Sequence, residues 1–123
     1  MVTASTRKNE VQKAEKMDYE IPVHELKGRL DVKEPLTLLD VREPWEYATA
    51  HIEGSKHIPM SEVPTRAHQE LDPEEHIVVV CHHGVRSLNV AHWLRQQGFE
   101  NAQSLRGGID QWSRAIDSKV PLY

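Results

Sequence analysis

The apolar and polar residues of this chain form short, strongly apolar runs that alternate with amphipathic segments. The clearest run is Ile77–Val80, four apolar residues of which three are valines, and it ends at a cysteine. A continuous apolar run bounded by turn residues is typical of a strand buried on both faces. Residues 36–41 predict a second buried strand. Residues 19–23, the residues before Pro59 and residues 101–106 predict shorter strands.

Helices are predicted for the segments between these runs. Apolar residues recur at helical spacing in residues 24–30, 61–71 and 87–97, and in a segment that starts after Gly107. Gly98 predicts the end of the third of these helices, because glycine readily takes the left-handed conformation that ends a helix. The alternation predicts a parallel α/β sheet covered on both faces, with its working crevice at the carboxyl ends of the strands.

Length and composition limit the domain organisation and the partners. The chain has 123 residues, enough for one domain, and we divide it into a polar tail (residues 1–18) and a single domain (residues 19–123). A formal net charge of -4 gives no electrostatic case for nucleic-acid binding, and no apolar run is long enough to span a bilayer. The single cysteine cannot form an internal disulfide, which favours a reducing, cytoplasmic location.

The most reactive side chain that the pattern predicts is Cys81. It follows the central strand and precedes a short loop that contains Gly84 and Arg86 and leads into the helix opened by Ser87. Inward backbone amides and a helix N-terminus bind anions, and together with Arg86 they stabilise a thiolate. We therefore expect Cys81 to be ionised near neutrality, at the base of an anion-binding loop. Ser87 has two open roles, a hydrogen bond to the sulfur or a cap of the helix.

Other polar residues near the predicted crevice have structural interpretations. Asp40 ends the second buried strand, and we expect it to accept backbone amides or to pair with an arginine rather than to act as a catalytic acid. Arg42 and Glu46 have the spacing of a structural ion pair on a helix. Three further side chains are candidates for the border of the pocket: Lys56, His57 and Arg106.

Three blocks of the sequence resemble the single-domain rhodaneses, a family of sulfurtransferases. The blocks are residues 39–47 continued by 51–55 and 58–59, residues 81–87, and residues 105–109 followed by Trp112. They occur in order and at family-like spacing, and the resemblance covers about residues 19–123. It implies a five-stranded, mainly parallel sheet with helices on both faces, and an active loop that begins at Cys81.

The same resemblance implies a reaction. The thiolate of Cys81 attacks the outer sulfur of a small anionic donor such as thiosulfate and keeps that sulfur as a persulfide. The sulfur then passes to cyanide, to a thiol or to a protein acceptor, and no cofactor is expected. The rest of the loop is implied to bind the substrate: His82, His83, Gly84, Val85, Arg86 and Ser87.

Loop length separates this reaction from a related one. Four residues lie between Cys81 and Arg86, one fewer than in the phosphatases that resemble this fold. The tighter loop favours sulfur transfer over a phosphatase or an arsenate reductase. The main alternative is a rhodanese-like module that carries sulfur for a partner protein, or regulates it, with little turnover of its own.

The two loop histidines also leave alternatives open. His82 and His83 either add positive charge near the anion and orient a substrate oxygen, or point to solvent so that only their backbone amides matter. A metal site built from Cys81, these histidines and His57 is not expected. Adjacent histidines on a tight loop rarely bind one ion together, and the sequence has no second cysteine.

Overall fold

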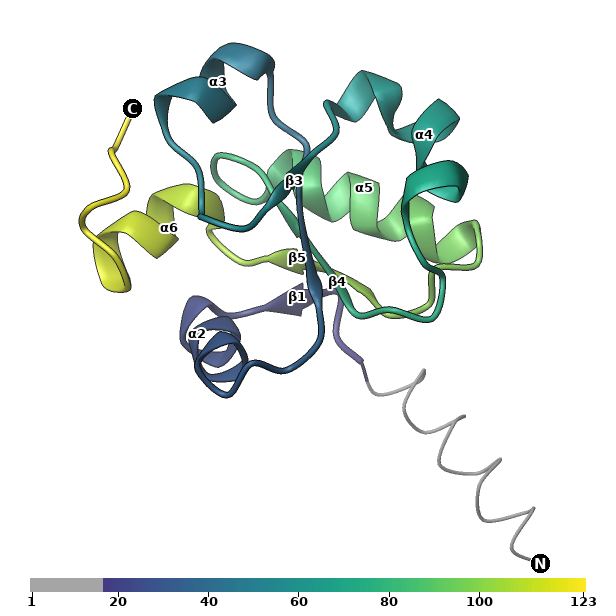
Figure 1. The fold of residues 1–123 in the computed structure, drawn as a ribbon, viewed down its shortest axis with the longest axis horizontal. Helices are drawn as coiled ribbons and strands as arrows, with labels where there is room; N and C mark the ends of the chain where they lie inside the picture. Colours follow the sequence, from purple (N-terminus) through teal and green to yellow (C-terminus); the bar gives the residue numbers. More distant parts are fainter. Residues whose placement is uncertain (1–16) are drawn as a thin grey trace, which may run out of the picture.

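The computed structural model describes residues 17–123. Within them, five parallel strands form one sheet in the order β1-β5-β4-β2-β3, with helices on either side (Figure 1). This confirms the predicted fold class. The strands are β1 (Glu20–Ile21), β2 (Thr37–Asp40), β3 (Lys56–His57), β4 (Ile77–Val80) and β5 (Ala102–Leu105). The helices are α2 (Val23–Asp31), α3 (Pro44–Thr49), the short 3₁₀ helix η1 (Met60–Glu62), α4 (Val63–Glu70), α5 (Val85–Gln96) and α6 (Gly108–Ala115).

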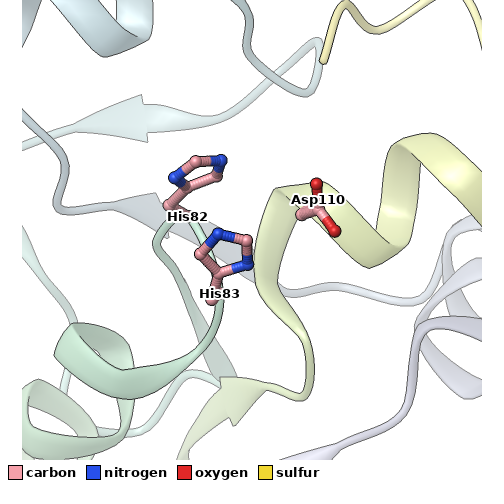
Figure 2. A group of neighbouring side chains, drawn as sticks. All are labelled: His82, His83 and Asp110. Carbon is pink, nitrogen blue, oxygen red and sulfur yellow. The ribbon is translucent and has the colours of Figure 1, made fainter. Parts of the chain in front are cut away.

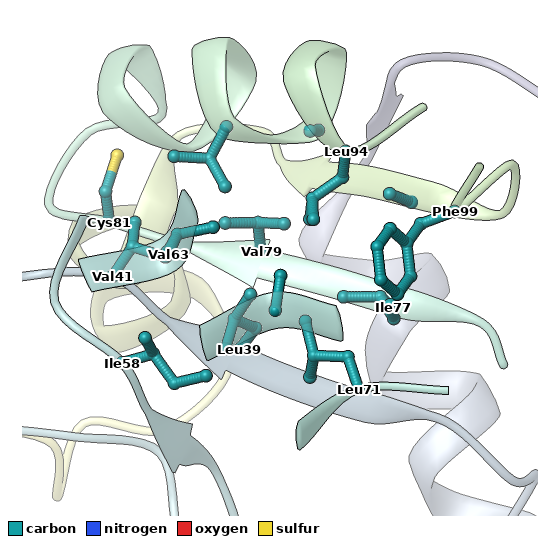
Figure 3. Packing of buried hydrophobic residues seen from close by; sticks show 14 residues of the cluster. Leu39, Val41, Ile58, Val63, Leu71, Ile77, Val79, Cys81, Leu94 and Phe99 are labelled. Carbon is teal, nitrogen blue, oxygen red and sulfur yellow. The ribbon is translucent and has the colours of Figure 1, made fainter. Parts of the chain in front are cut away.

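The central strand β4 is buried along its whole length, as its apolar run predicts. Because side chains alternate across a strand, Ile77 and Val79 enter one hydrophobic cluster while Val78 and Val80 enter another. Cys81 continues the first set and lies at the edge of its cluster, as Figure 3 shows. The position of the cysteine is therefore fixed by the packing of the strand that precedes it.

Helices cover both faces of the sheet. On one face, α4 and α5 contribute Val63 and Leu94 to the cluster that contains Cys81. On the other face, α2 and α6 contribute Leu26 and Trp112 to the second cluster. Two separate apolar layers on a parallel sheet explain why the central strand β4 is a continuous apolar run.

The parallel arrangement gathers the carboxyl ends of β2, β4 and β5 at one edge of the sheet. The N–H of Val41 donates to the carbonyl of Val80 at 3.0 Å, and the N–H of Ile109 donates to the carbonyl of Cys81 at 2.9 Å. The segments that follow three strands are thus joined by backbone hydrogen bonds around the cysteine. This is the edge at which ligands of open parallel sheets bind.

Two helix boundaries differ from the sequence-based prediction. Helix α5 begins at Val85, two residues before Ser87, and the predicted helix 61–71 is divided into η1 and α4. The end of α5 is as predicted, since Gly98 has φ +99° and the N–H of Phe99 donates to the carbonyl of Leu94 at 3.0 Å.

The first described residues are held against α5. The guanidinium of Arg95 donates to the carbonyl of Met17 at 3.2 Å and to that of Asp18 at 2.6 Å. The predicted tail, residues 1–18, lies almost entirely outside the described residues, so the division into tail and domain stays a prediction. None of the helices within residues 17–123 has the length and apolar composition that crossing a membrane requires.

Candidate active site

The sulfur of Cys81 is surrounded by hydrogen-bonding groups of the loop that follows it. Its Sγ accepts the N–H of Gly84 at 3.1 Å and the N–H of Ser87 at 3.2 Å. The hydroxyl of Ser87 lies 3.2 Å from the same sulfur. Cys81 exposes only 1% of its surface, so these donors act in a site with little competing water. The arrangement stabilises negative charge on the sulfur.

The loop reaches this geometry through a glycine and the first turn of α5. Gly84 has φ +104° and is the residue directly before the helix. A side chain there would begin with a Cβ atom 3.2 Å from the backbone nitrogen of Gly107. Ser87 consequently lies in the first turn of α5 and not at the cap, and both its N–H and its hydroxyl face the sulfur.

A second serine supports the first. The Oγ of Ser104, in β5, lies 2.7 Å from the Oγ of Ser87 and 3.4 Å from the carbonyl oxygen of Gly84. Ser104 is fully buried, and a buried hydroxyl needs such partners. Sequence patterns did not single out Ser104, because β5 also contains Gln103 and so does not mark Ser104 as the one polar residue of an apolar strand.

Two backbone N–H groups in the first turn of α5 are unpaired within the described residues. Within residues 17–123, neither the N–H of Val85 nor that of Arg86 has a hydrogen-bond partner. The first N–H groups of a helix have no acceptor inside the helix, and they carry the positive end of its dipole. An anion that approaches the sulfur therefore meets unpaired backbone donors.

Arg86 is bound to a protein carboxylate. Its two terminal nitrogens donate to the two carboxylate oxygens of Glu46 at 2.8 and 3.0 Å. The hydroxyl of Tyr123 also donates to Glu46, at 2.8 Å. The expectation that Arg86 contacts a substrate anion stays a prediction, but its guanidinium is already largely committed to linking α5 to α3.

Asp40 and Arg42 form a charged pair at the end of β2. This pair confirms the structural role expected of Asp40 and contradicts the expected pairing of Arg42 with Glu46. Both carboxylate oxygens of Asp40 accept hydrogen bonds from the guanidinium of Arg42, at 2.8 and 2.6 Å, and both residues are buried. This is the structural role expected of Asp40. The predicted ion pair between Arg42 and Glu46 is wrong, because the Glu46 carboxylate is bound by Arg86. Arg42 reaches only the backbone carbonyl of Glu46, at 3.4 Å.

Within residues 17–123, neither loop histidine makes a hydrogen bond to the Cys81 sulfur. The ring of His82 instead lies against two other rings. The ring of His82 lies parallel to that of Tyr123, with centroids 4.0 Å apart and an angle of 9° between the planes. Its other neighbour is His83, at 3.9 Å between centroids (Figure 2). Burial, followed by the charge of His83, lowers the pKa of His82 below its usual value.

The three side chains considered for the pocket border have other partners. Lys56 pairs with Glu70 at 3.1 Å, and His57 shares a hydrogen bond with the carbonyl of Arg42 at 2.7 Å. Arg106 pairs with Glu20 at 3.3 Å and lines a surface cavity of about 570 Å³ that includes no residue of the loop 81–87. The structure does not bring these three side chains to the sulfur.

We expect the Glu46 carboxylate to make stability depend on acidity. Hydrogen bonds from Arg86 lower the pKa of Glu46 from 4.5 to about 2, although burial acts in the opposite direction. A lowered pKa stabilises the fold above the unfolded-state value, and this stabilisation is lost as the pH falls from about 4.5 to about 2. In Glu46→Gln, the free energy of unfolding should fall by up to about 3 kcal/mol at neutral pH and vary less over this acid range.

Urea unfolding between pH 2 and pH 7 measures this effect. Glu53→Gln is the control, since Glu53 is exposed and makes no hydrogen bond within residues 17–123. An acid dependence of Glu46→Gln that equals that of the unchanged protein would contradict the assignment of the lowered pKa to this pair.

Comparisons with known proteins place this geometry in a family. The sequence profile described as "Rhodanese-like domain" matches residues 22–115. The "Putative sulfur carrier protein YrkF" of Bacillus subtilis is 40% identical over 94 residues, which are 76% of this chain and 50% of that protein. The "Thiosulfate sulfurtransferase GlpE" of Actinobacillus pleuropneumoniae is 40% identical over 82 residues, which are 67% of this chain and 75% of that protein.

A solved structure agrees with both relatives. The rhodanese-like domain protein from Staphylococcus aureus superposes with a TM-score of 0.74 at 30% identity, covering 86% of this chain and 99% of that one. The chain thus spans half the length of YrkF but matches nearly the whole of a separate rhodanese-like domain. The profile match, the relatives and the amide-bound cysteine agree, and the chain belongs to the rhodanese-like family of sulfurtransferases.

Proposed function

We propose that this protein moves a sulfane sulfur from thiosulfate or a persulfide to a thiophilic acceptor, such as cyanide or a thiol, through a persulfide on Cys81. One observation carries the proposal: the Cys81 sulfur accepts two backbone N–H groups at the N-terminus of α5, beside the hydroxyl of Ser87. The name of GlpE supports thiosulfate as the donor.

The reaction consists of two displacements at sulfur. The Cys81 thiolate attacks the outer sulfur of thiosulfate, a new S–S bond forms, and sulfite leaves with the electron pair of the bond that breaks. The acceptor then attacks the outer sulfur of the persulfide, and the electron pair of that S–S bond returns to Cys81 as the thiolate. The unpaired N–H groups of Val85 and Arg86 are placed to stabilise the departing anion.

Because the Cys81 sulfur is buried, the part of the donor that reacts with it must be narrow. Because Cys81 is only 1% exposed, we expect a donor to present a terminal sulfur atom while its charged oxygens stay at the mouth of the loop. The same restriction applies to the acceptor in the second step. A protein acceptor is included in the proposal only if it presents an exposed thiolate.

A carrier or regulatory module is the second candidate, supported by the similarity to the putative sulfur carrier YrkF. The two candidates share the persulfide and differ in turnover. A carrier keeps its sulfur until a partner arrives, whereas an enzyme passes it repeatedly to a small nucleophile.

Thiocyanate formation from thiosulfate and cyanide tests the proposal and separates the two candidates. An enzyme should give parallel double-reciprocal lines when one substrate is varied at several concentrations of the other, as covalent double displacement requires. A persulfide that forms with thiosulfate but releases little thiocyanate to cyanide would favour the carrier. The absence of both the persulfide and thiocyanate would reject the proposal.

Removing the Ser87 hydroxyl should slow the reaction without unfolding the protein. Ser87→Ala deletes the hydroxyl that accepts from the Cys81 thiol at 3.2 Å and is able to donate to the thiolate, and it leaves the N–H of residue 87 in place. We expect kcat/KM for thiosulfate to fall about tenfold, the effect of one hydrogen bond to a charged group. Ser113→Ala is the matched control, because this buried hydroxyl bonds to the carbonyl of Val120 in another part of the fold. An equal loss of kcat/KM in the two variants would contradict the role of Ser87.

A further inference from the structure

We propose that His82, His83 and Asp110 form a binding site for a divalent transition-metal ion, best matched by Zn²⁺. Each of these residues offers one ligand atom, and the three atoms lie within 4.8 Å of one another (Figure 2). In a tetrahedral zinc site, bonds of about 2.0–2.1 Å place neighbouring ligand atoms about 3.4 Å apart. Side-chain rotations that move the ligand atoms by about 1 Å therefore bring all three within bonding distance of one ion.

The backbone already holds the two parts of this site together. The N–H of Asp110 donates to the carbonyl of His82 at 3.1 Å, and the N–H of Ile109 donates to the carbonyl of Cys81 at 2.9 Å. Gly108 packs so closely on these carbonyls that a Cβ atom would lie 2.3 Å from the oxygen of His82. The start of α6 and the loop therefore form one rigid unit, and only side chains need to move.

The nitrogen Nε2 of His82 lacks a partner. It is buried and makes no hydrogen bond of normal geometry within residues 17–123, although the backbone of Tyr123 lies near the ring. Stacking against the Tyr123 ring limits how far the His82 ring can turn to find one. A metal ion bound to His82 is one way to satisfy such a nitrogen.

The donor set matches the chemistry of zinc. Two imidazole nitrogens and one carboxylate oxygen are ligands that Zn²⁺ accepts, and three protein ligands leave a fourth position for water or another molecule. The Nε of Arg114 donates to Oδ2 of Asp110 at 3.0 Å, which orients the carboxylate and leaves its other oxygen for the ion. His83 is exposed, so an ion reaches the site from solvent.

From sequence, a metal was not expected because adjacent histidines on a tight loop rarely bind one ion together, but in the structure their ring centroids lie 3.9 Å apart and Asp110 joins them. His57, which was considered as a further ligand, is bonded to the carbonyl of Arg42 and stacked on Tyr47. Asp110 takes its place from a helix that begins 26 residues after His82, because β4 and β5 are neighbouring parallel strands. Metal binding here does not depend on the proposed sulfur transfer.

Zinc titration of the Cys81→Ser protein tests this site, since that protein contains no thiol. Calorimetry should show one Zn²⁺ bound per chain, and Co²⁺ should give the intense visible absorption of a tetrahedral site. Asp110→Asn and His83→Ala, each added to Cys81→Ser, should weaken the binding of Zn²⁺ by more than about tenfold.

Matched controls exclude binding by surface residues in general. His24→Ala and Asp31→Asn remove an exposed histidine and an exposed carboxylate of α2, and they should leave Zn²⁺ affinity unchanged. Circular dichroism establishes that each variant is folded, and two separate ligand variants keep the test decisive if one is not. No binding at millimolar Zn²⁺, or equal binding by the ligand variants and the controls, would overturn the proposal.

Discussion

Replacement of Cys81 by serine is expected to lower thiocyanate formation from thiosulfate and cyanide by more than about a thousandfold, as removal of a catalytic nucleophile does. A serine hydroxyl is not ionised near neutrality and does not form a persulfide, so neither displacement takes place. The fold should persist, because the N–H groups of Gly84 and Ser87 that now bond to the sulfur are able to donate to an oxygen in its place. Initial rates at saturating thiosulfate measure the loss.

The unchanged fold must be shown alongside the lost activity. Circular dichroism and the thermal midpoint of Cys81→Ser should match those of the unchanged protein to within a few degrees. Turnover of the folded variant within tenfold of the unchanged protein would exclude Cys81 from the mechanism.

Replacement of Gly108 by alanine is expected to cause a large loss of stability. Gly108 has φ +64°, and a Cβ atom there would lie 2.3 Å from the carbonyl oxygen of His82 and 2.5 Å from that of Cys81. Both contacts are with backbone atoms, which cannot rotate away as the end of a side chain does. The loop and α6 must separate, and we expect the free energy of unfolding to fall by more than about 2 kcal/mol, with the sulfur-transfer rate falling as well.

Gly28→Ala is the matched control for this substitution. Gly28 lies inside α2, and nothing lies within 4 Å of the position of its missing Cβ. Alanine favours a helix interior over glycine, so this variant should gain about 0.5–1 kcal/mol. Urea unfolding of both variants gives the comparison. A Gly108→Ala protein as stable as the unchanged one would show that the loop and α6 are not held together as tightly as this contact indicates.

Most of the fold was predictable because its signals are local. The apolar run of β4 places alternate side chains in two separate core layers, so that run by itself predicts burial on both faces. Gly98 predicts the end of α5 for a similar reason, since the left-handed conformation it adopts is marked by one residue type. The start of α5 was misplaced because a serine is a better helix cap than most residues, whereas the residue used is Gly84, at φ +104°.

The partners of the site residues were less predictable because they are distant in sequence. Spacing suggested that Glu46 pairs with Arg42, but its carboxylate binds Arg86, 40 residues away. Asp110 and Tyr123 gave no local signal at all, and they reach the loop only because the chain folds back across the edge of the sheet. Sequence patterns predicted the position of Cys81 and the loop after it, and the tertiary fold decided which charged groups surround them.

A persulfide on Cys81 would be detected in the intact mass of the protein after incubation with thiosulfate and removal of the excess donor. We expect a gain of one sulfur atom, located on the peptide that contains Cys81 and released by cyanide with formation of thiocyanate. The Cys81→Ser protein should gain no mass under the same conditions. An unchanged mass of the folded, reduced protein would contradict the claim that this amide-bound sulfur accepts a sulfane sulfur.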